Sequence, residues 1–426
     1  MNQMNTDKPV NFLGRLALAF QRSLSLWERP FAAAVLTGLI FIGIQLSSGR
    51  PFASSGNAYY NFLADAFLHG QLHLRLLPAS TQDLSLYHGQ YFLYWGPLPA
   101  VLLMPFVALF GVGFSDTLQT VFFGSVNAAV FAMILRCSDQ QGITQLSPLR
   151  RVFMVLFFVL GTAQTPIIPL GGVWHLGQLV ALCFVLLAYL AALALQDEKA
   201  FFWTGCALAG VLATRTSAIF AGIFLAWYLL NHHWRLGSVR LVRCSLLGIA
   251  PVGAVLLLLL VYNTARFGSP LDFGLNYHLM TEVFRENFAK YGVLNVHYIA
   301  ANLSSDFIFY PFLSFRPLQV EAMGGSLFLL SPLYLAAITA LWQNRKNSTT
   351  WFLFLTILVS VIPSLLIMAP GTVSFGPRYL LDAAPPLLLL TAIGVRRWSV
   401  PMIVFCVVIS VLHYLIGALM MFHSWY

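Results

Sequence analysis

The sequence feature that most constrains this chain is a succession of apolar segments long enough to cross a lipid bilayer. A helix needs about 20 mainly apolar residues to span the roughly 30 Å of hydrocarbon in a bilayer. Runs near that length lie at 31–46, 98–114, 117–135, 152–169, 176–195, 201–230, 245–262, 324–341, 351–368, 383–394 and 399–422. We therefore expect an all-α polytopic membrane protein with about eleven transmembrane helices.

Charged side chains are too scarce to coat a soluble protein of this size. Hydrophobic residues make up 59% and charged residues 9% of the 426 positions. The 23 Lys and Arg outnumber the 14 Asp and Glu, but they are scattered through short loops, which fits membrane orientation and disfavours nucleic acid as a partner. We expect one transmembrane domain over 31–426, preceded by a cytoplasmic or interfacial amphipathic segment over 1–30.

Basic loops predict which side of the membrane each part of the chain faces, because short cytoplasmic loops carry an excess of Lys and Arg. The basic loops lie at 231–243, 343–348 and 395–398. Counting spans from them places the N-terminus in the cytoplasm, and the C-terminus and three loops on the extracytoplasmic side. These extracytoplasmic loops are 47–96, 264–323 and 369–381, and the two long ones are expected to carry short interfacial helices.

One conflict with this orientation leaves the register of the spans between 98 and 230 open. Arg136, Arg150 and Arg151 flank a short loop that strict alternation would place outside, against the usual charge bias. The conflict is relieved if 98–114 is re-entrant and 201–230 is two short helices that meet at Arg215.

The first long loop contains two segments with recognisable local structure. NAYYNFLADAFLHGQLHL, at 57–74, has apolar residues at helical spacing and predicts a helix on the membrane surface, with Asp65 on its solvated face. DLSLYHGQYFLYWGP, at 83–97, predicts a turn at His88-Gly89, a short extended aromatic segment and a helix that starts at Pro97.

The aromatic residues of 83–97 have two explanations. Tyr and Trp collect at membrane boundaries because their rings prefer the interface, and this explains Tyr91 and Tyr94 about as well as a binding site does. The carboxylate of Asp83 is not explained by an aromatic belt, so Asp83 becomes a candidate functional residue.

Three arginines are candidates for binding an anion. Arg215 lies inside an apolar run, where a charge marks a functional site by default, although a buried structural pair is an equal alternative. Arg266 lies among aromatic residues near the expected membrane boundary, which suits an anionic lipid headgroup. Arg378 and Asp382, in FGPRYLLDAAPP, either pair with each other or bind a ligand.

Several protein classes are disfavoured by motifs that the sequence lacks. It contains no Walker loop, HExxH motif, CxxC pair or nucleophile elbow, which argues against an ATP-driven pump, a zincin or a serine hydrolase. Its five widely spaced cysteines form neither a disulfide framework nor a zinc pattern. Carboxylates are almost absent from the apolar runs, which argues against a proton- or sodium-coupled transporter.

Five segments occur in an order typical of one enzyme superfamily. They are YYNFLADAFLHGQLHL, YHGQYFLYWGPLPAVLLMPFVALFG, LAGVLATRTSAI, YNTARFGSPLDFGLNY and GPRYLLDAAPPL, all within 30–395. In this order the chain resembles bacterial membrane glycosyltransferases of the GT-C superfamily, in the group around mannosyltransferases and aminoarabinose transferases. The resemblance implies inverting transfer of a sugar from a polyprenyl-phosphate donor to an envelope glycan or lipid acceptor, at the outer face of the bacterial inner membrane.

The resemblance also implies roles for site residues. Relatives place a carboxylate of the first long loop near the acceptor, as a base or a metal-associated group, and basic residues near the lipid phosphate. They commonly carry an acidic pair where this chain has Gly56 and Asn57, and an asparagine cannot act as a base. Asp83 is therefore the favoured catalytic carboxylate and Asp65 the alternative, while the involvement of a divalent cation stays open.

The remaining candidates complete the expected substrate site. They are Arg215 and Arg378 on the phosphate side, Arg266 as a third cation, and His88, Tyr91, Tyr94 and Tyr379 as further binding residues. Two other functions stay open: a flippase or transporter of lipid-linked glycans, and a non-catalytic partner in envelope assembly with the same fold.

Overall fold

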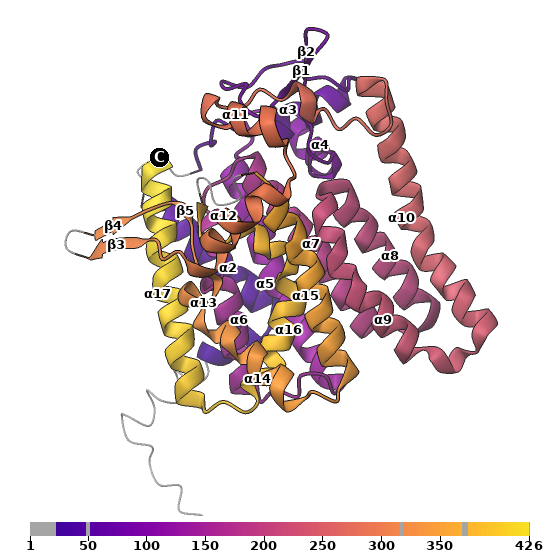
Figure 1. Ribbon diagram of the computed structural model, residues 1–426, viewed down its shortest axis with the longest axis vertical. Helices are drawn as coiled ribbons and strands as arrows, with labels where there is room; N and C mark the ends of the chain where they lie inside the picture. Colours follow the sequence, from indigo (N-terminus) through magenta and orange to yellow (C-terminus); the bar gives the residue numbers. More distant parts are fainter. Residues whose placement is uncertain (1–22, 48–51, 316–317, 369–373, 426) are drawn as a thin grey trace, which may run out of the picture.

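The chain is mostly helical in the computed structural model, which describes residues 23–47, 52–315, 318–368 and 374–425. The long helices run side by side along the molecule (Figure 1). They are α2 (Pro30–Leu46), α4 (Leu98–Phe110), α5 (Asp116–Gln140), α6 (Pro148–Leu160), α7 (Val173–Ala194), α8 (Asp197–Thr214), α9 (Ile223–His232), α10 (Ser238–Phe267), α15 (Ser348–Leu366), α16 (Ala384–Val395) and α17 (Val400–Trp425).

Short elements connect and cover these helices. The short α-helices are α3 (Tyr59–Leu68), α11 (Glu282–Tyr291), α12 (Ile299–Leu303), α13 (Leu327–Leu330) and α14 (Ala336–Gln343). The strands are β1 (Ser85–Tyr87), β2 (Gln90–Phe92), β3 (Phe312–Phe315), β4 (Leu318–Val320), β5 (Met323–Gly324) and β6 (Ser374–Phe375). Short stretches of other helix types are η1 (Leu26–Glu28), η2 (Thr165–Ile167), η3 (Thr216–Gly222), η4 (Trp234–Leu236), η5 (Leu275–Tyr277), η6 (Val296–Tyr298), η7 (Ser304–Ile308, a π-helix), η8 (Pro332–Leu335) and η9 (Arg378–Ala383).

The helices confirm a multi-pass membrane protein but not the expected count of eleven spans. Six helical segments among the described residues are long and apolar enough to cross a membrane: Asp116–Gln140, Val173–Ala194, Ser238–Phe267, Ser348–Leu366, Arg378–Val395 and Val400–Ser424. Three shorter apolar stretches accompany them, Pro30–Leu46, Leu98–Phe110 and Thr216–His232. Most of the 1–30 segment and part of the 369–381 loop lie outside the described residues, and the division of the chain into domains stays a prediction.

The run 201–230 is broken in the middle, as one of the two schemes left open by the sequence proposed. Helix α8 ends at Thr214, Arg215 has an extended backbone with φ −151°, and the chain then continues through η3 into α9. Arg215 therefore lies between two helices, as the C-cap of α8 and the N-cap of η3, and its side chain is not part of either helix surface.

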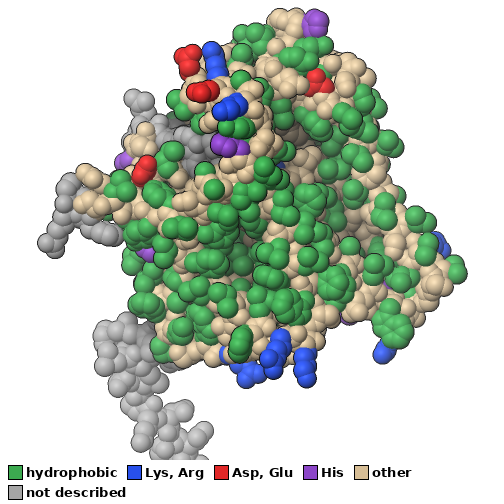
Figure 2. Space-filling model, viewed as in Figure 1, with side chains coloured by type: hydrophobic (Ala, Val, Ile, Leu, Met, Phe, Trp, Pro, Cys, Tyr) green, Lys and Arg blue, Asp and Glu red, His purple; other side chains and the backbone are tan. Residues whose placement is uncertain are grey.

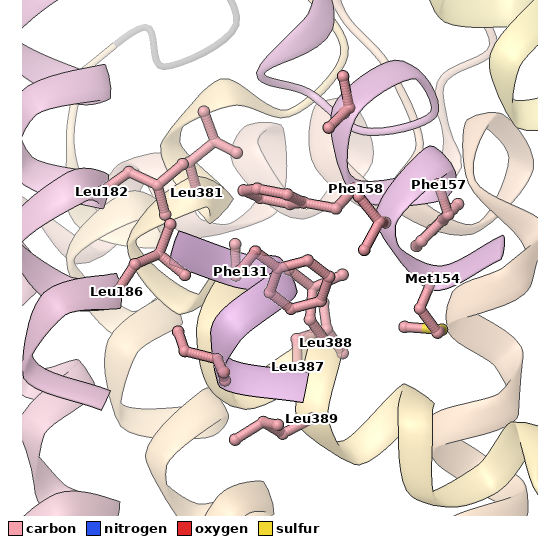
Figure 3. Close-up of a cluster of buried hydrophobic side chains, with 14 of the residues drawn as sticks. Phe131, Met154, Phe157, Phe158, Leu182, Leu186, Leu381, Leu387, Leu388 and Leu389 are labelled. Atoms are coloured by element: carbon pink, nitrogen blue, oxygen red, sulfur yellow. The ribbon is translucent and has the colours of Figure 1, made fainter. Parts of the chain in front are cut away.

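Helices α5, α6, α7 and α16 surround the largest apolar core. Phe131 of α5, Phe158 of α6 and Leu182 of α7 converge there with leucines of α16 (Figure 3). Every residue of α16 is buried, which agrees with its uniformly apolar sequence, since a helix that is apolar on all sides has no face for water.

Helix α10 is the opposite case, because only 6% of its most apolar 18-residue stretch is buried inside the protein. It packs mainly against α8, at a point where a Cβ on Gly205 would lie 2.0 Å from the carbonyl oxygen of Gly248. Its outward face is apolar, with Leu257 and Leu258 about two-thirds exposed.

Apolar side chains likewise cover the middle of the molecule, and charged side chains gather towards its two ends (Figure 2). This distribution suits a bilayer around the middle.

Helix α3, the β1–β2 hairpin and α11 lie together at one end of the molecule, which we call the loop end (Figure 1). The hairpin turns at His88 and Gly89, whose φ values of 49° and 77° are those of a tight hairpin turn, and α4 begins directly after Pro97. These features confirm the local structure predicted for 83–97. The prediction of a helix within 57–74 is also confirmed, by α3.

Main-chain pairing connects the two long loops at the loop end. The amide of Asp83 donates to the carbonyl of Leu279 at 2.8 Å, and the amide of Leu279 donates to the carbonyl of Leu84 at 2.8 Å. A third connection lies nearby, because β5 pairs in parallel with β6 just before Arg378. Segments far apart in the sequence therefore present their side chains to one region.

Candidate functional site

A small cavity lies near the loop end, where α3, α7, α8, η9 and the segment before α4 meet. Both cationic and aromatic side chains line it. The lining residues are Tyr60, Trp95, Val173, Trp174, Gly177, Gln178, Thr214, Arg215, Arg378 and Tyr379. Three residues selected from the sequence, Arg215, Arg378 and Tyr379, therefore share one cavity.

Arg215 is held by an ion pair across the fold. Its Nε atom lies 2.9 and 3.0 Å from the two carboxylate oxygens of Asp382, and the hydroxyl of Ser217 donates to the same carboxylate at 2.7 Å. Its guanidinium also lies over the Tyr379 ring, 4.7 Å from the ring centre. The pairing of Asp382 with Arg378, one of the two alternatives left by the sequence, is wrong because Asp382 bonds Arg215.

Arg378 is the cation of the cavity that has no ion-pair partner among the described residues. It follows β6 at the start of η9, is 8% exposed, and makes no ion pair within the described part of the chain. Its Nε atom has no hydrogen-bond partner there, while its guanidinium lies 5.1 Å from the centre of the Tyr379 ring. A buried charge without a counterion is costly, so this arrangement is suited to an anionic ligand.

Asp83 lies at the edge of the cavity, not in solvent. Its two carboxylate oxygens accept hydrogen bonds from different elements: Nε1 of Trp174, a lining residue, at 3.0 Å, and Nε2 of His278 at 2.9 Å. Its charge lies within electrostatic reach of Arg378. The structure therefore brings Asp83 next to the cationic cavity, although Asp83 is not a lining residue.

Aromatic rings form the wall between Asp83 and the cavity. The ring of Tyr94 stacks on Trp95 with 4.0 Å between ring centres and meets His278 edge-on at 4.9 Å. Burial raises the pKa of Tyr94 well above its usual range, and the nearby Asp83 carboxylate raises it further. The Tyr94 hydroxyl therefore stays protonated at neutral pH and can donate a hydrogen bond.

Asp65, the alternative catalytic carboxylate, is engaged elsewhere. Its oxygens accept hydrogen bonds from Arg75 at 2.9 and 3.0 Å, and it is 8% exposed. The expectation that Asp65 lies on a solvated helix face is wrong, because α3 turns this residue towards the chain that follows it and Arg75 returns to cover it.

The other candidate residues lie outside the cavity lining. Arg266 is buried, donates to the Leu93 carbonyl at 2.7 Å and lies over the ring of Tyr262. His88 is exposed at the hairpin turn, and Tyr91 packs on the second apolar cluster, around α3 and α4. The structure therefore gives these three residues positions in local packing or at the surface.

Several site residues were missed by reasoning from the sequence. Trp174 and Gln178 line the cavity from the first turns of α7, four residues apart and thus on one helix face, a spacing that could have been noticed. Tyr60 on α3 also lines the cavity. Its hydroxyl packs closely on Gly177, because a Cβ added at Gly177 would lie only 2.9 Å from it. His278 had no local signal, since its partner is 195 residues distant.

Asp116 was also missed, and it positions the start of α7. It is 1% exposed and accepts hydrogen bonds from the amide of Gly172 at 2.7 Å, the amide of Ser55 at 2.9 Å and the Ser55 hydroxyl. Because Gly172 caps α7, these bonds set the position of Trp174 in the first turn of that helix.

No group of three or more His, Cys, Asp or Glu side chains that could hold a metal ion lies within the described residues. The carboxylates near the cavity are Asp83, Asp382 and Asp116, and each is bonded to neighbouring donors. The cavity lining contains two arginines and no carboxylate, and the question of a divalent cation stays open.

Comparison with known proteins finds similarity only to solved structures, at low sequence identity. No family model matches the sequence, and no curated protein matches it. Among solved structures the chain is similar to ArnT from Cupriavidus metallidurans bound to undecaprenyl phosphate, with 13% identity and a TM-score of 0.47, over 91% of this chain and 61% of that one. It is also similar to the Archaeoglobus fulgidus oligosaccharyltransferase in the apo form, with 12% identity and a TM-score of 0.49, over 93% of this chain and 56% of that one.

A third similar structure is the oligosaccharyltransferase AglB from Archaeoglobus fulgidus in complex with an inhibitory peptide and a dolichol-phosphate, with 11% identity and a TM-score of 0.42, over 93% of this chain and 55% of that one. ArnT and AglB are glycosyltransferases of the GT-C superfamily that the sequence motifs resemble. The chain spans between 55 and 61% of the length of these proteins. With TM-scores below 0.5, these similarities carry no argument about activity, substrate or site residues.

Proposed function

We propose that this protein is a membrane glycosyltransferase that moves a sugar, with inversion, from a polyprenyl-phosphate donor to an envelope glycan or lipid acceptor. The observation that carries the proposal is the buried, unpaired guanidinium of Arg378 in a cavity that also contains Arg215. The proposal includes the orientation expected from the basic loops, with the loop end outside the bacterial inner membrane, and a single transmembrane domain.

A phosphate group satisfies the cavity better than a neutral ligand does. Asp382 neutralises Arg215, so the pair contributes no net charge, and Arg378 supplies one positive charge with an open Nε donor. Guanidinium groups bind phosphate oxygens through charge-assisted hydrogen bonds. A phosphate that leaves in a transfer reaction gains negative charge, and a preformed cation stabilises that charge in the transition state.

The lipid part of the donor fits the surroundings of the cavity. The lining residues come from helices with long apolar stretches, and apolar side chains cover the surface below the loop end (Figure 2). A polyprenyl chain can therefore lie in the bilayer while its phosphate reaches Arg378. The aromatic side chains of Trp95, Trp174 and Tyr60 offer flat surfaces for the sugar.

The acceptor side of the reaction is assigned to the Asp83 region. An acceptor hydroxyl that attacks the anomeric carbon must lose its proton, and a positioned base accelerates this step by about 10²- to 10⁴-fold. The leaving phosphate needs no proton at neutral pH, so the base is the main proton-transfer group that the reaction requires. Asp83 supports a part in this step, either as the base or as the residue that orients the base, because it lies beside the cavity and within electrostatic reach of Arg378.

The test uses purified protein in nanodiscs. Wild type is incubated with a panel of undecaprenyl-phosphate sugars and with lipopolysaccharide or lipid-linked glycan acceptors, and release of undecaprenyl phosphate is measured. Binding of undecaprenyl phosphate alone is measured for wild type and Arg378→Gln. Since a hydrogen bond to a charged group contributes about 1.5–3 kcal/mol, we expect Arg378→Gln to weaken binding by about 10- to 100-fold.

The matched control is Arg397→Gln, which removes an exposed arginine at the other end of α16 and should leave binding unchanged. A second arm follows a fluorescent lipid-linked glycan in proteoliposomes. Movement of the glycan lipid between leaflets without sugar transfer would replace the enzyme proposal with the flippase alternative. Equal binding by wild type and Arg378→Gln would remove Arg378 as the phosphate site.

A further inference from the structure

A carboxylate and an imidazole from the two long loops form a close pair beside the cavity. Nε2 of His278 lies 2.9 Å from Oδ1 of Asp83, and the two side chains are 11% and 18% exposed. The second oxygen of Asp83 accepts a hydrogen bond from Nε1 of Trp174 at 3.0 Å. Both oxygens of the carboxylate are therefore engaged, by two donors with fixed positions.

The backbone holds this pair in place from both sides. Asp83 and His278 are brought together by the main-chain bonds between Asp83, Leu84 and Leu279, and by a β-bridge between Ser85 and His278. Asp83 itself has a φ of 64°, a left-handed conformation that costs energy in residues other than glycine. Such conformations persist where the surrounding structure enforces them, often at functional sites.

The bonding pattern makes the imidazole a better proton acceptor than the carboxylate. Each oxygen of Asp83 already accepts a hydrogen bond, from Trp174 or from His278. An acceptor hydroxyl would therefore have to share an oxygen with one of these donors or displace it. In a neutral imidazole whose Nε2–H faces the carboxylate, Nδ1 carries the lone pair. No hydrogen bond to Nδ1 of His278 is found among the residues that the structure describes.

The pair also lies close to the groups that would hold the donor. His278 meets the ring of Tyr94 at 4.9 Å, and Tyr94 stacks on Trp95 of the cavity wall. Trp174 belongs to the wall and bonds Asp83 directly. Tyr59, Tyr94 and Arg378 are among the titratable or charged groups within electrostatic reach of Asp83, so a cation and two neutral phenols lie near the pair.

We propose that His278 is the catalytic base of the transfer and that Asp83 is the positioning residue that orients it. This inference rests on the proposed glycosyltransferase function. The acceptor oxygen forms a bond to the anomeric carbon while the bond from that carbon to the phosphate oxygen breaks and its electron pair leaves with polyprenyl phosphate. The hydroxyl proton moves to Nδ1 of His278, and the Asp83 carboxylate stabilises the resulting imidazolium before the proton is released to water.

The experiment measures kcat against pH for transfer from an undecaprenyl-phosphate sugar, with wild type and variants in nanodiscs. We expect the wild-type rate to rise with pH, because general-base catalysis requires the base in its unprotonated form. His278→Gln should lose at least about 100-fold in kcat and lose the rising limb, because the base is gone. Asp83→Asn should keep a rising limb at a reduced kcat, since the imidazole remains but its orienting carboxylate is lost.

Two further measurements separate a catalytic role from a structural one. The variant His278→Ala should regain activity when free imidazole is added, because the added imidazole can accept the proton in place of the missing side chain. If His278 only held the two loops together, free imidazole would not restore activity. Binding of undecaprenyl phosphate should stay within about twofold of wild type in all three variants. The matched control is His297→Gln, an exposed histidine of the same loop, which should behave as wild type.

The outcomes distinguish this inference from the function on which it rests. If wild type transfers no sugar from any lipid phosphate, the proposed function itself fails. If wild type is active and His278→Gln keeps the rising limb while Asp83→Asn loses it, Asp83 is the base and the inference about His278 is overturned. Loss of the limb in His278→Gln together with rescue by imidazole supports it.

Discussion

Arg215 and Asp382, 167 positions apart, form a buried ion pair with Nε 2.9 Å from the nearer carboxylate oxygen. The pair uses the carboxylate that η9 itself carries, so Arg378 makes no ion pair within the described part of the chain. An arginine for which the sequence left pairing with Asp382 and ligand binding equally open is thereby made available to a ligand.

Asp382→Asn should destabilise the fold, because it leaves the buried Arg215 charge without a partner. Removing one member of a buried pair costs about 3–5 kcal/mol, so thermal unfolding in nanodiscs should shift down by several degrees. The control is Asp197→Asn, whose pair with Arg240 is 43–47% exposed and should contribute less than about 1 kcal/mol. Equal shifts in the two variants would show that the Arg215 pair is not structural.

Trp174→Phe should lower activity without weakening donor binding. The substitution keeps an aromatic ring in the cavity wall but removes the Nε1 donor that holds Asp83 at 3.0 Å. We expect kcat to fall about tenfold, in line with loss of one hydrogen bond to a charged group, and affinity for undecaprenyl phosphate to stay unchanged. Weaker binding at unchanged kcat would instead assign Trp174 to the donor.

Gly96→Ala should displace the segment that carries Trp95. A Cβ at this position would lie 2.3 Å from the carbonyl oxygen of Ala213, in the last turn of α8, so one of the two backbones must move. We expect a loss of about 1–3 kcal/mol in stability together with loss of activity. Gly113→Ala is the control, because no atom lies within 4 Å of a Cβ there, and it should be near neutral in both assays.

Asp306 should make the protein less stable as pH rises. It is 1% exposed within η7, and burial raises its pKa from 3.8 to about 7. Below pH 3.8 the carboxyl is protonated in both the folded and the unfolded chain, so it has no effect. Between that pH and about 7 the unfolded chain ionises first, and the penalty grows to a few kcal/mol at most.

Asp306→Asn removes this penalty and should therefore raise the thermal midpoint more at pH 8 than at pH 5, where only about a third of the penalty has developed. Thermal unfolding across that pH interval provides the measurement. Glu282→Gln, a change at a 91% exposed carboxylate of the same loop, should give no pH-dependent gain. A gain of equal size at both pH values would show that packing, and not ionisation, causes the effect.

Local features of the sequence predicted local structure well. The turn at His88-Gly89, the helix start at Pro97 and the break at Arg215 were all confirmed. Each depends on the conformational preferences of a few neighbouring residues, which act over one turn of chain. The count of spans was not confirmed, since apolar runs such as 98–114 and 324–341 form shorter or broken helices.

The composition of the candidate site was only partly predictable. Arg215, Arg378 and Tyr379 were selected because charge is costly inside apolar sequence, and all three line the cavity. Asp65 was selected because it lies in the same long loop as Asp83, but Arg75 bonds its carboxylate away from the cavity lining. Nothing near His278 in the sequence indicates that it meets Asp83, because that contact depends on pairing between two loops.

The sequence by itself determined that this chain is a helical membrane protein and which charges must be accommodated, since hydrophobicity and charge act residue by residue. Only the tertiary structure decided which carboxylate neutralises which arginine and which of the acidic residues lies beside the cavity. Electrostatic energies and hydrogen bonds depend on distances of a few ångströms. Those distances are set when helices and loops from distant parts of the chain pack together.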